Sequence, residues 1–251
     1  MARRNRPPEF PWLEEDDSFR FPEPERATAE GILAVGGNLS PGMLLSAYRQ
    51  GVFPWFSEND PILWWCPDPR FVVFLSHVHI SKSMRKFLRK RVFRVTIDAD
   101  FRAVIDACAK TPRAHQSGTW ISDEMRNAYL ELHRLGYAHS CEVWDGSELV
   151  GGLYGVAVGR MFFGESMFSH RSNASKSAFI HLATFLQMHE FELVDSQVRT
   201  EHVETLGGSE IPREEFLALV RTYTNRPALE RWSERFDEAS VVKAAITDEL
   251  S

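Results

Sequence analysis

Residues 138–168, AHSCEVWDGSELVGGLYGVAVGRMFFGESMF, decide the fold class of this chain. Apolar residues recur here with the short period of strands, in contrast to the helical spacing of the residues before them. Asp145-Gly146 is a turn signal of the kind that joins two antiparallel strands. The stretch therefore predicts three antiparallel strands, over 138–144, 148–158 and 160–168.

Helical patterns and further strands surround this stretch. Capping residues and apolar spacing predict helices over 41–50, 80–91, 100–109, 123–135, 175–189 and from Pro212, and strands over 92–97 and 192–198. Three antiparallel strands, a helix and a returning strand form an α+β layout with a mostly antiparallel sheet. The order resembles the acyltransferase fold that many N-acetyltransferases share.

Prolines and tryptophans concentrate in residues 51–70, GVFPWFSENDPILWWCPDPR. Such a segment forms a rigid aromatic surface and marks a boundary between domains. We therefore expect a small N-terminal domain at 1–68, packed on a catalytic domain at 69–251. The first 30 residues contain five prolines and are expected to form an irregular wrap.

The bulk composition narrows the class of protein. The net charge is −6 over 251 residues, so the chain is not a basic nucleic-acid coat, and any RNA contact has to use a local patch. Its three cysteines form no CxxC pair, and no apolar run reaches the length of a membrane span. The start, MARRNRPPEF, lacks the apolar stretch of a signal peptide. We expect a cytoplasmic protein without membrane contact.

One candidate site lies on the expected strand at 192–198. Alternate side chains of a strand share a face, so Asp195 and Gln197 are expected to point the same way. A carboxylate and an amide this close together can bind and orient a protonatable amine. Alternatively, the two residues form a hydrogen-bonded pair that closes the edge of the strand.

A second candidate is Glu165, which stands among apolar residues in MFFGESMF, residues 161–168. A carboxylate is costly to bury unless it is paired. Strand alternation places Glu165 on one face with Phe163 and Met167, which suits a pocket for an apolar group beside an amine or hydroxyl. The alternative is a structural salt bridge to Arg160, Arg171 or Lys176.

Aromatic and basic residues offer contacts for RNA. Trp55 and Trp120 are candidates for stacking on a nucleobase, which contributes about 1–3 kcal/mol, although either is also suited to a core. The expected helix at 80–91 contains no acid and is basic, so it is a candidate for contact with the phosphate backbone or is a solvated face. Its basic residues include Lys82, Arg85, Lys86, Arg89 and Lys90.

Two absences bear on the chemistry. No glycine occurs between Gly164 and Gly207, whereas an acetyltransferase that uses coenzyme A has a glycine-rich turn to cradle the pyrophosphate. No HExxH motif, Walker loop or Cys/His metal spacing occurs either. We therefore expect no cofactor and no metal.

Several segments, in order from about residue 31 to 216, resemble the leucyl/phenylalanyl-tRNA–protein transferase family. The most specific in combination are FPWF, GESMFS and the DSQ triplet. The others are GILAVGGNLSPGMLLSAYRQGV, DPILWWCPDPR, HISKSMRKF, GTWI, AHSCEVW, ELVGGLYGVAVG, NASKSA, LVDSQV and LGGSEIPREEF.

The resemblance implies an enzyme that moves Leu or Phe, with Met also possible, from aminoacyl-tRNA to the N-terminal Arg or Lys of an acceptor protein. Such proteins are thereby marked for N-end-rule degradation. It also implies that Trp55 and Trp120 hold the terminal adenosine, and that Asp195 and Gln197 stand at the reacting centre while Glu165 helps to bind substrate. The pocket for the aminoacyl side chain would comprise Leu153, Phe162, Met167, Leu182, Leu186 and Val194.

Relatives commonly have methionine where Leu153 stands and an aromatic residue where Leu182 stands, so the preference among Leu, Phe and Met stays open. In the expected mechanism Gln197 accepts a hydrogen bond from the acceptor amine, and Asp195 orients Gln197. We expect a monomer. The alternatives are an N-acetyltransferase that uses coenzyme A and a tRNA-binding protein without catalysis.

Overall fold

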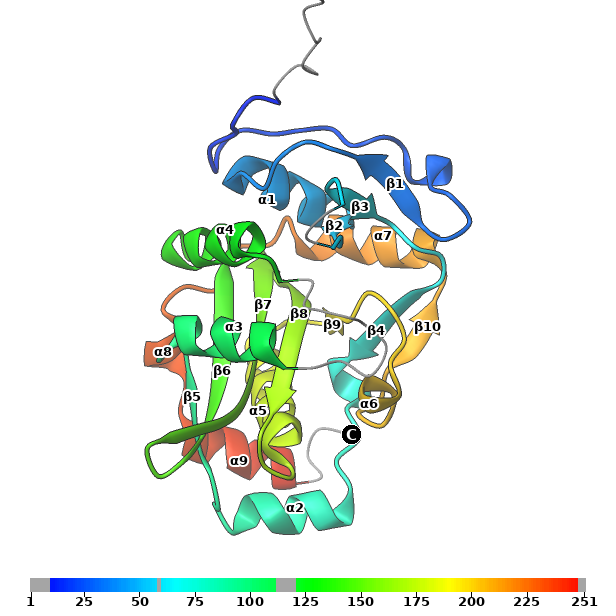
Figure 1. Cartoon of the computed structure of the whole chain (residues 1–251). Helices are drawn as coiled ribbons and strands as arrows, with labels where there is room; N and C mark the ends of the chain where they lie inside the picture. Colours follow the sequence, from blue (N-terminus) through cyan, green and yellow to red (C-terminus); the bar gives the residue numbers. More distant parts are fainter. Residues whose placement is uncertain (1–9, 58–59, 112–120, 248–251) are drawn as a thin grey trace, which may run out of the picture.

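The computed structural model describes residues 10–57, 60–111 and 121–247. Within these ranges the chain forms two sheets with helices around them (Figure 1). The larger sheet has the strand order β10-β4-β9-β8-β7-β6-β5, and the smaller has the order β1-β3-β2. In the larger sheet only β8 and β9 pair in parallel. The prediction of mixed α and β structure with a mostly antiparallel sheet is confirmed.

The three strands predicted from residues 138–168 form the centre of the larger sheet. Tight turns join them, so consecutive strands are neighbours and antiparallel. The strands of this sheet are β4 (Arg70–Phe74), β5 (Arg94–Ile97), β6 (Ala138–Asp145), β7 (Glu148–Val158), β8 (Met161–Ser169), β9 (Leu193–Asp195) and β10 (Ser209–Ile211). Those of the smaller sheet are β1 (Ile32–Val35), β2 (Phe53–Pro54) and β3 (Leu63–Trp65).

The predicted helices all form. The hydroxyl groups of Ser81 and Ser122 accept hydrogen bonds from N–H groups in the first turns of α2 and α4, as capping residues do. The helices are α1 (Pro41–Arg49), α2 (Lys82–Arg89), α3 (Phe101–Lys110), α4 (Asp123–Arg134), α5 (Ala174–Met188), α6 (Glu201–Glu204), α7 (Arg213–Tyr223), α8 (Trp232–Arg235) and α9 (Glu238–Ile246). Two short 3-10 helices are Pro24–Arg26 and Leu75–His77.

The small N-terminal part lies against one end of the larger sheet (Figure 1). Its helix α1 is buried from Pro41 to Tyr48 because it packs between the smaller sheet and the rest of the molecule. Gly51 ends this helix with a φ of +72°, and a Cβ there would stand 2.6 Å from Leu217 of α7. Helix α7, from the later part of the chain, therefore packs on the N-terminal part.

The strands differ from the sequence prediction in two ways: one predicted strand is shorter, and β1, β2, β3, β4 and β10 were not predicted. The strand expected at 192–198 ends at Asp195, because Gln197 adopts a left-handed φ of +57° that leaves the sheet. Strand β4 was not predicted at all. Its sequence, RFVVF, is buried on both faces, so it lacks the alternation that identifies a half-buried strand.

Candidate functional site

A cavity of about 550 Å³ opens between the N-terminal part, helix α5 and strands β7, β8 and β9. Five of the six residues expected to hold an apolar side chain line it: Leu153, Phe162, Met167, Leu182 and Val194. Leu186 does not line the cavity, since it is fully buried in the core behind it. The volume lies in the range of small-ligand sites, and the walls suit an apolar group.

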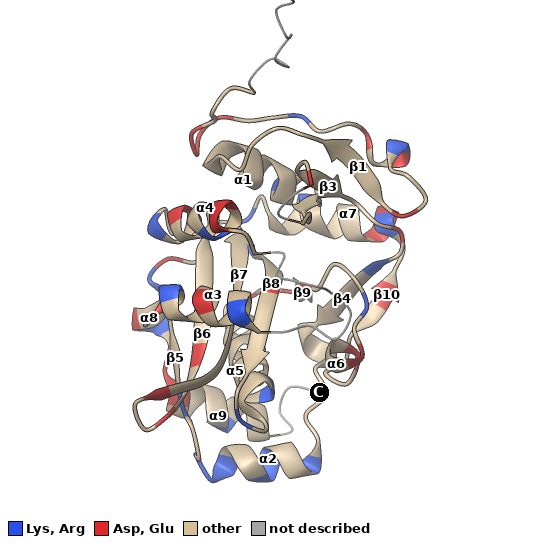
Figure 2. Ribbon diagram, in the orientation of Figure 1, with Lys and Arg blue, Asp and Glu red and all other residues tan. Residues whose placement is uncertain are grey.

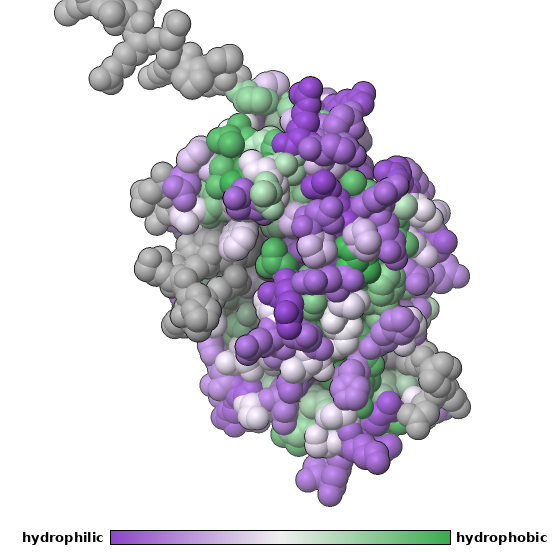
Figure 3. Space-filling view, turned by 90° about the vertical axis from the view of Figure 1, so that its right-hand side faces the viewer, coloured by the Kyte–Doolittle hydropathy of each residue, from purple (hydrophilic) through white to green (hydrophobic). Residues whose placement is uncertain are grey.

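Several residues that line the cavity were not among the site residues predicted from the sequence. Phe179 of α5 stands at helical spacing from Leu182, so the apolar period of this helix carries a signal for it. The cavity is also lined by residues in and next to the four-residue helix α6, which was not predicted from the sequence: Thr200, His202 and Val203. Val198 also lines the cavity and is 40% exposed, so the cavity reaches solvent there. The face shown in Figure 3 is largely hydrophilic, with smaller apolar areas between charged side chains.

Asp195 does not line the cavity, because its carboxylate is turned into the protein. Arg70 forms a bidentate ion pair with it, with Nε at 2.8 Å from Oδ1 and Nη2 at 2.6 Å from Oδ2. The side chains are 1% and 0% exposed, and the guanidinium lies 4.6 and 4.4 Å from the ring centres of Phe53 and Phe216. Sequence reasoning missed Arg70, whose only signal is a lone cation at the start of an apolar run.

Gln197 lines the cavity, and its main chain is held at two points. Its N–H donates to Asp195 Oδ1 at 2.9 Å, and its carbonyl accepts from the Phe71 N–H at 3.2 Å. The prediction that Asp195 and Gln197 share one face of a strand is wrong, because the strand ends between them. Asp195 instead fixes the backbone from which the Gln197 side chain projects.

Glu165 is the extra residue of a β-bulge. In the pairing of β7 with β8, Tyr154 lies opposite Ser166 and the next residue, Gly155, lies opposite Gly164. Glu165 is skipped, so no residue of β7 faces it. The bulge breaks the predicted alternation: Glu165 reaches α1 and α4, while Met167 packs against the core that contains Leu153 and Leu182. Tyr48 and Tyr129 donate to its two carboxylate oxygens, each at 2.7 Å. Arg171 pairs with Asp145 instead of Glu165.

Burial dominates the electrostatics of this carboxyl group. Removal from water raises the pKa of Glu165 to about 7, although the hydrogen bonds from Tyr48 and Tyr129 oppose the rise. Burial also raises the pKa of both phenols well above the ordinary value. Around neutral pH, therefore, the phenols stay protonated and Glu165 exchanges a proton.

The aromatic and basic candidates lie apart. Trp55 lines the cavity and packs on Trp65 at 5.5 Å between ring centres, whereas Trp120 lies outside the described residues. The basic helix α2 stands at the end of the molecule farthest from the N-terminal part (Figure 1), and its Lys and Arg positions are the blue segments of its ribbon in Figure 2. Four of its expected phosphate-binding residues, Lys82, Lys86, Arg89 and Lys90, are exposed, and Arg85 is half-buried.

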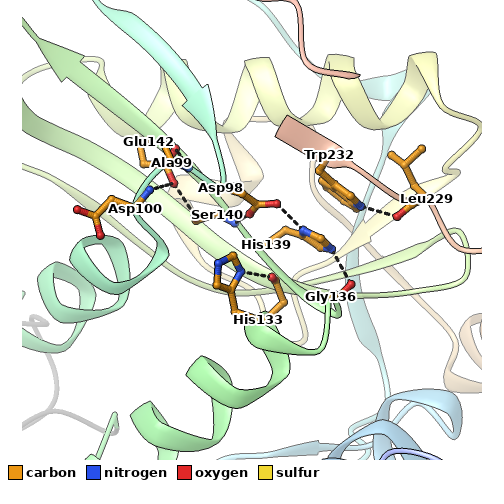
Figure 4. Close-up of polar contacts among 11 residues, drawn as sticks. Asp98, Ala99, Asp100, His133, Gly136, His139, Ser140, Glu142, Leu229 and Trp232 are labelled. Atoms are coloured by element: carbon orange, nitrogen blue, oxygen red, sulfur yellow. Dashed lines mark hydrogen bonds and ion pairs between the residues drawn. The ribbon is translucent and has the colours of Figure 1, made fainter. Parts of the chain in front are cut away.

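A second polar cluster, around His139, is internally satisfied (Figure 4). His139 Nδ1 lies 2.7 Å from Asp98 Oδ2, its Nε2 lies 3.2 Å from the Gly136 carbonyl, and its ring stacks on Trp232 at 3.8 Å. Both nitrogens thus face oxygen atoms of the protein, and His139 does not line the cavity. The cluster ties α8 to the sheet and is structural.

None of the helices in the described ranges combines the length and the apolar character that a membrane-spanning helix requires.

Comparison with known proteins gives matches over most of the chain. The model of the family described as "Leucyl/phenylalanyl-tRNA protein transferase" matches residues 72–221, and that of its N-terminal domain matches residues 37–68. A relative in Syntrophus aciditrophicus (strain SB) is 56% identical over 85% of this chain and 90% of its own length. One in Desulfatibacillum aliphaticivorans is 53% identical over 86% and 94%. One in Xylella fastidiosa (strain M12) is 54% identical over 87% and 91%.

Each of these three relatives bears the name "Leucyl/phenylalanyl-tRNA--protein transferase". Among solved structures, that of L-PGS from Bacillus licheniformis overlaps 61% of this chain and 51% of that one, at 10% identity and a TM-score of 0.36. A likeness this weak does not bear on the fold.

Proposed function

The chain belongs to the leucyl/phenylalanyl-tRNA–protein transferase family, and on that premise we propose how its cavity performs the reaction. The enzyme is an aminoacyltransferase that moves Leu or Phe from aminoacyl-tRNA to the N-terminus of a protein. One observation carries the assignment of the site: an apolar cavity has Gln197 and Glu165 in its wall and Trp55 at its N-terminal side.

The apolar wall receives the aminoacyl side chain. Leu153, Phe162 and Leu182 come from β7, β8 and α5 and surround one volume, so a leucine or phenylalanine side chain is removed from water there. Met167 and Val194 complete the wall, and Leu186 supports it from the core. Leu153 and Leu182 are the positions that set the preference among Leu, Phe and Met.

Trp55 provides the platform for the terminal adenosine of the tRNA. The indole is half-buried, and its packing on Trp65 fixes the plane of its ring. A base can therefore stack on it without a further loss of conformational entropy by the tryptophan side chain. We assign Trp120 the same role on the evidence of the sequence. The exposed basic residues of α2 bind phosphates farther along the tRNA.

Gln197 receives the acceptor amine through its side-chain carbonyl. Aminoacyl-tRNA is an activated ester, so the reaction depends mainly on holding the amine against the ester carbonyl. Asp195 and Arg70 act as a brace for this residue, because Asp195 Oδ1 accepts from the Gln197 N–H and Arg70 fixes the carboxylate. Since Arg70 compensates its charge, Asp195 contributes little to attracting a cationic acceptor.

The acceptor is a protein with Arg or Lys at its N-terminus, and its modification marks it for N-end-rule degradation. The division into residues 1–68 and 69–251 is supported by the boundary between the two matching family models. Strands β6, β7 and β8 followed by α5 and a parallel β9 support an acyltransferase-like architecture for the second part.

A panel of acceptor peptides tests this proposal. Peptides that differ only in their first residue, Arg, Lys, Asp, Glu or Met, are incubated with Leu-tRNA or Phe-tRNA, and the extended peptide is quantified. Extension of the Arg and Lys peptides is expected, and blocking the amine by acetylation abolishes it. Extension of the Asp and Glu peptides alone would contradict the assigned acceptor class.

A further inference from the structure

Three oxygen-bearing groups form a closed triangle beside the cavity. Tyr48 Oη and Tyr129 Oη each lie 2.7 Å from a different carboxylate oxygen of Glu165, and the two phenol oxygens lie 2.7 Å from each other. The tyrosines come from α1 and α4, and both are fully buried. We refer to these three residues as the Tyr48–Tyr129–Glu165 ring.

The three contacts require three hydrogens. Oxygen atoms at 2.7 Å are at the usual separation of an O–H···O hydrogen bond, so each contact holds one hydrogen. The two phenols supply one each, because burial keeps them protonated. When Glu165 is protonated it supplies the third hydrogen: its carboxyl group donates to one phenol, that phenol donates to the other, and the second phenol donates back to Glu165. The closed ring with a hydrogen in every contact is therefore the protonated form. Ionised Glu165 accepts from both phenols but leaves no hydrogen between them.

The surroundings of the ring favour exchange of this proton near neutral pH. From β7, Tyr154 packs on Tyr129 at 5.5 Å between ring centres. From β9 and β4, Asp195 and Arg70 act on Glu165 with opposite signs, and they are paired with each other. Burial is the largest influence and raises the pKa of Glu165 to about 7.

The transfer reaction releases a proton that has to be taken up. An α-ammonium nitrogen carries three hydrogens, and the amide nitrogen of the product keeps one. Of the two that leave, one goes to the ribose oxygen as the ester C–O bond breaks, and the other is lost as a proton. At neutral pH most α-amino groups start in the ammonium form, so this second proton must leave for the amine to attack.

We propose that the Tyr48–Tyr129–Glu165 ring is the acceptor of this proton, an inference that rests on the proposed function. Glu165 enters the cycle as a carboxylate with two phenol donors. It takes the proton from the acceptor's ammonium group, the new peptide bond forms, and the ring closes with three hydrogens. Glu165 lines the cavity while the tyrosines lie behind it, so the proton enters and leaves through Glu165.

Infrared difference spectroscopy on the substrate-free full chain tests the ring without any transfer. Spectra recorded between about pH 5 and about pH 9 report the carbonyl stretch of protonated carboxyl groups. A band that titrates near pH 7 in the wild type and is missing in Glu165→Gln is expected. Identical difference spectra for the two proteins would overturn the ring.

The pH dependence of kcat/KM provides the functional test. Removing one phenol takes a hydrogen bond from the carboxylate, so Tyr48→Phe and Tyr129→Phe should shift the acidic limb to higher pH by about one to two units. Tyr223→Phe is the matched control, because its hydroxyl donates to Glu192 at 2.9 Å outside the ring, and its profile should match the wild type.

Different outcomes would contradict the proposed function and the role of the ring. Absence of transfer by the wild-type enzyme at every pH would contradict the proposed function. Normal wild-type transfer, with the acidic limb unmoved in both ring variants, would leave the proposed function standing and overturn the role of the ring. Because the acceptor amine is the same throughout, its own titration cancels in the comparison.

Discussion

Replacing the buried ion pair one residue at a time should cost more stability than replacing both residues together. In Asp195→Leu the guanidinium of Arg70 loses both of its partners on Asp195 while remaining 1% exposed. Removal of one member of a buried pair typically costs about 3–5 kcal/mol, because the other charge is left without compensation. Arg70→Met should lower the free energy of unfolding by a similar amount, because it leaves the buried Asp195 carboxylate without its cation.

The double variant, Arg70→Met with Asp195→Leu, leaves no stranded charge. Methionine also fits between the rings of Phe53 and Phe216, which now flank the guanidinium. Exchange of a buried ion pair for apolar residues is often neutral or stabilising, so the expected net loss is about 1 kcal/mol, from the hydrogen bond to the Gln197 N–H. Transfer activity should stay reduced by about 100-fold in the double variant, because Gln197 has lost its brace.

Urea denaturation of the wild type, the two single variants and the double variant measures the free energies of unfolding. Labelled phenylalanine transfer, measured on the same preparations, gives the activities. A loss of stability in the double variant equal to the sum of the two single losses would show that the two buried charges do not compensate each other. Recovery of full activity together with stability would refute the role of Asp195 as a brace.

Three further predictions concern binding. Trp55→Ala should weaken the affinity for aminoacyl-tRNA by about 1–3 kcal/mol, measured by filter binding, and Trp12→Ala, which alters an exposed tryptophan outside the cavity lining, serves as the control. Leu153→Ala should favour Phe over Leu by about 1–3 kcal/mol in a competition between the two charged tRNAs, because it enlarges the apolar pocket; an unchanged ratio would place the side chain elsewhere. Lys82→Ala with Lys86→Ala should reduce the slope of log affinity against log salt by about 1.4–1.8, and an unaltered slope would remove α2 from the tRNA interface.

Most helices and the central strands could be predicted from the sequence, because their signals lie in residues that are close together along the chain. Ser81 and Ser122 indicate where α2 and α4 begin, because each hydroxyl accepts a hydrogen bond from the N–H three residues later. The turn at Asp145-Gly146 sets the pairing of β6 with β7. Leu182 lies on the apolar face that its helical period predicts. Leu153, Phe162 and Leu182 were assigned to one pocket by the family resemblance, and all three line one cavity.

The polar partners could not be predicted in the same way. Arg70 and Asp195 are 125 positions apart, and Tyr48 and Glu165 are 117 apart, so only the tertiary fold brings each pair together. Two backbone irregularities also lack a local signal. The bulge at Glu165 and the left-handed conformation of Gln197 each redirect a side chain that regular strand alternation would have pointed elsewhere.

Transfer by this enzyme is tested most directly by mass spectrometry of a protein that begins with Arg, after incubation with the enzyme and Phe-tRNA. We expect a gain in mass of one phenylalanine residue, with fragment ions that place it before the Arg, and no gain when the N-terminal amine is acetylated. An unchanged mass, or a phenylalanine attached to the acetylated protein, would contradict transfer to the N-terminal amine by this enzyme.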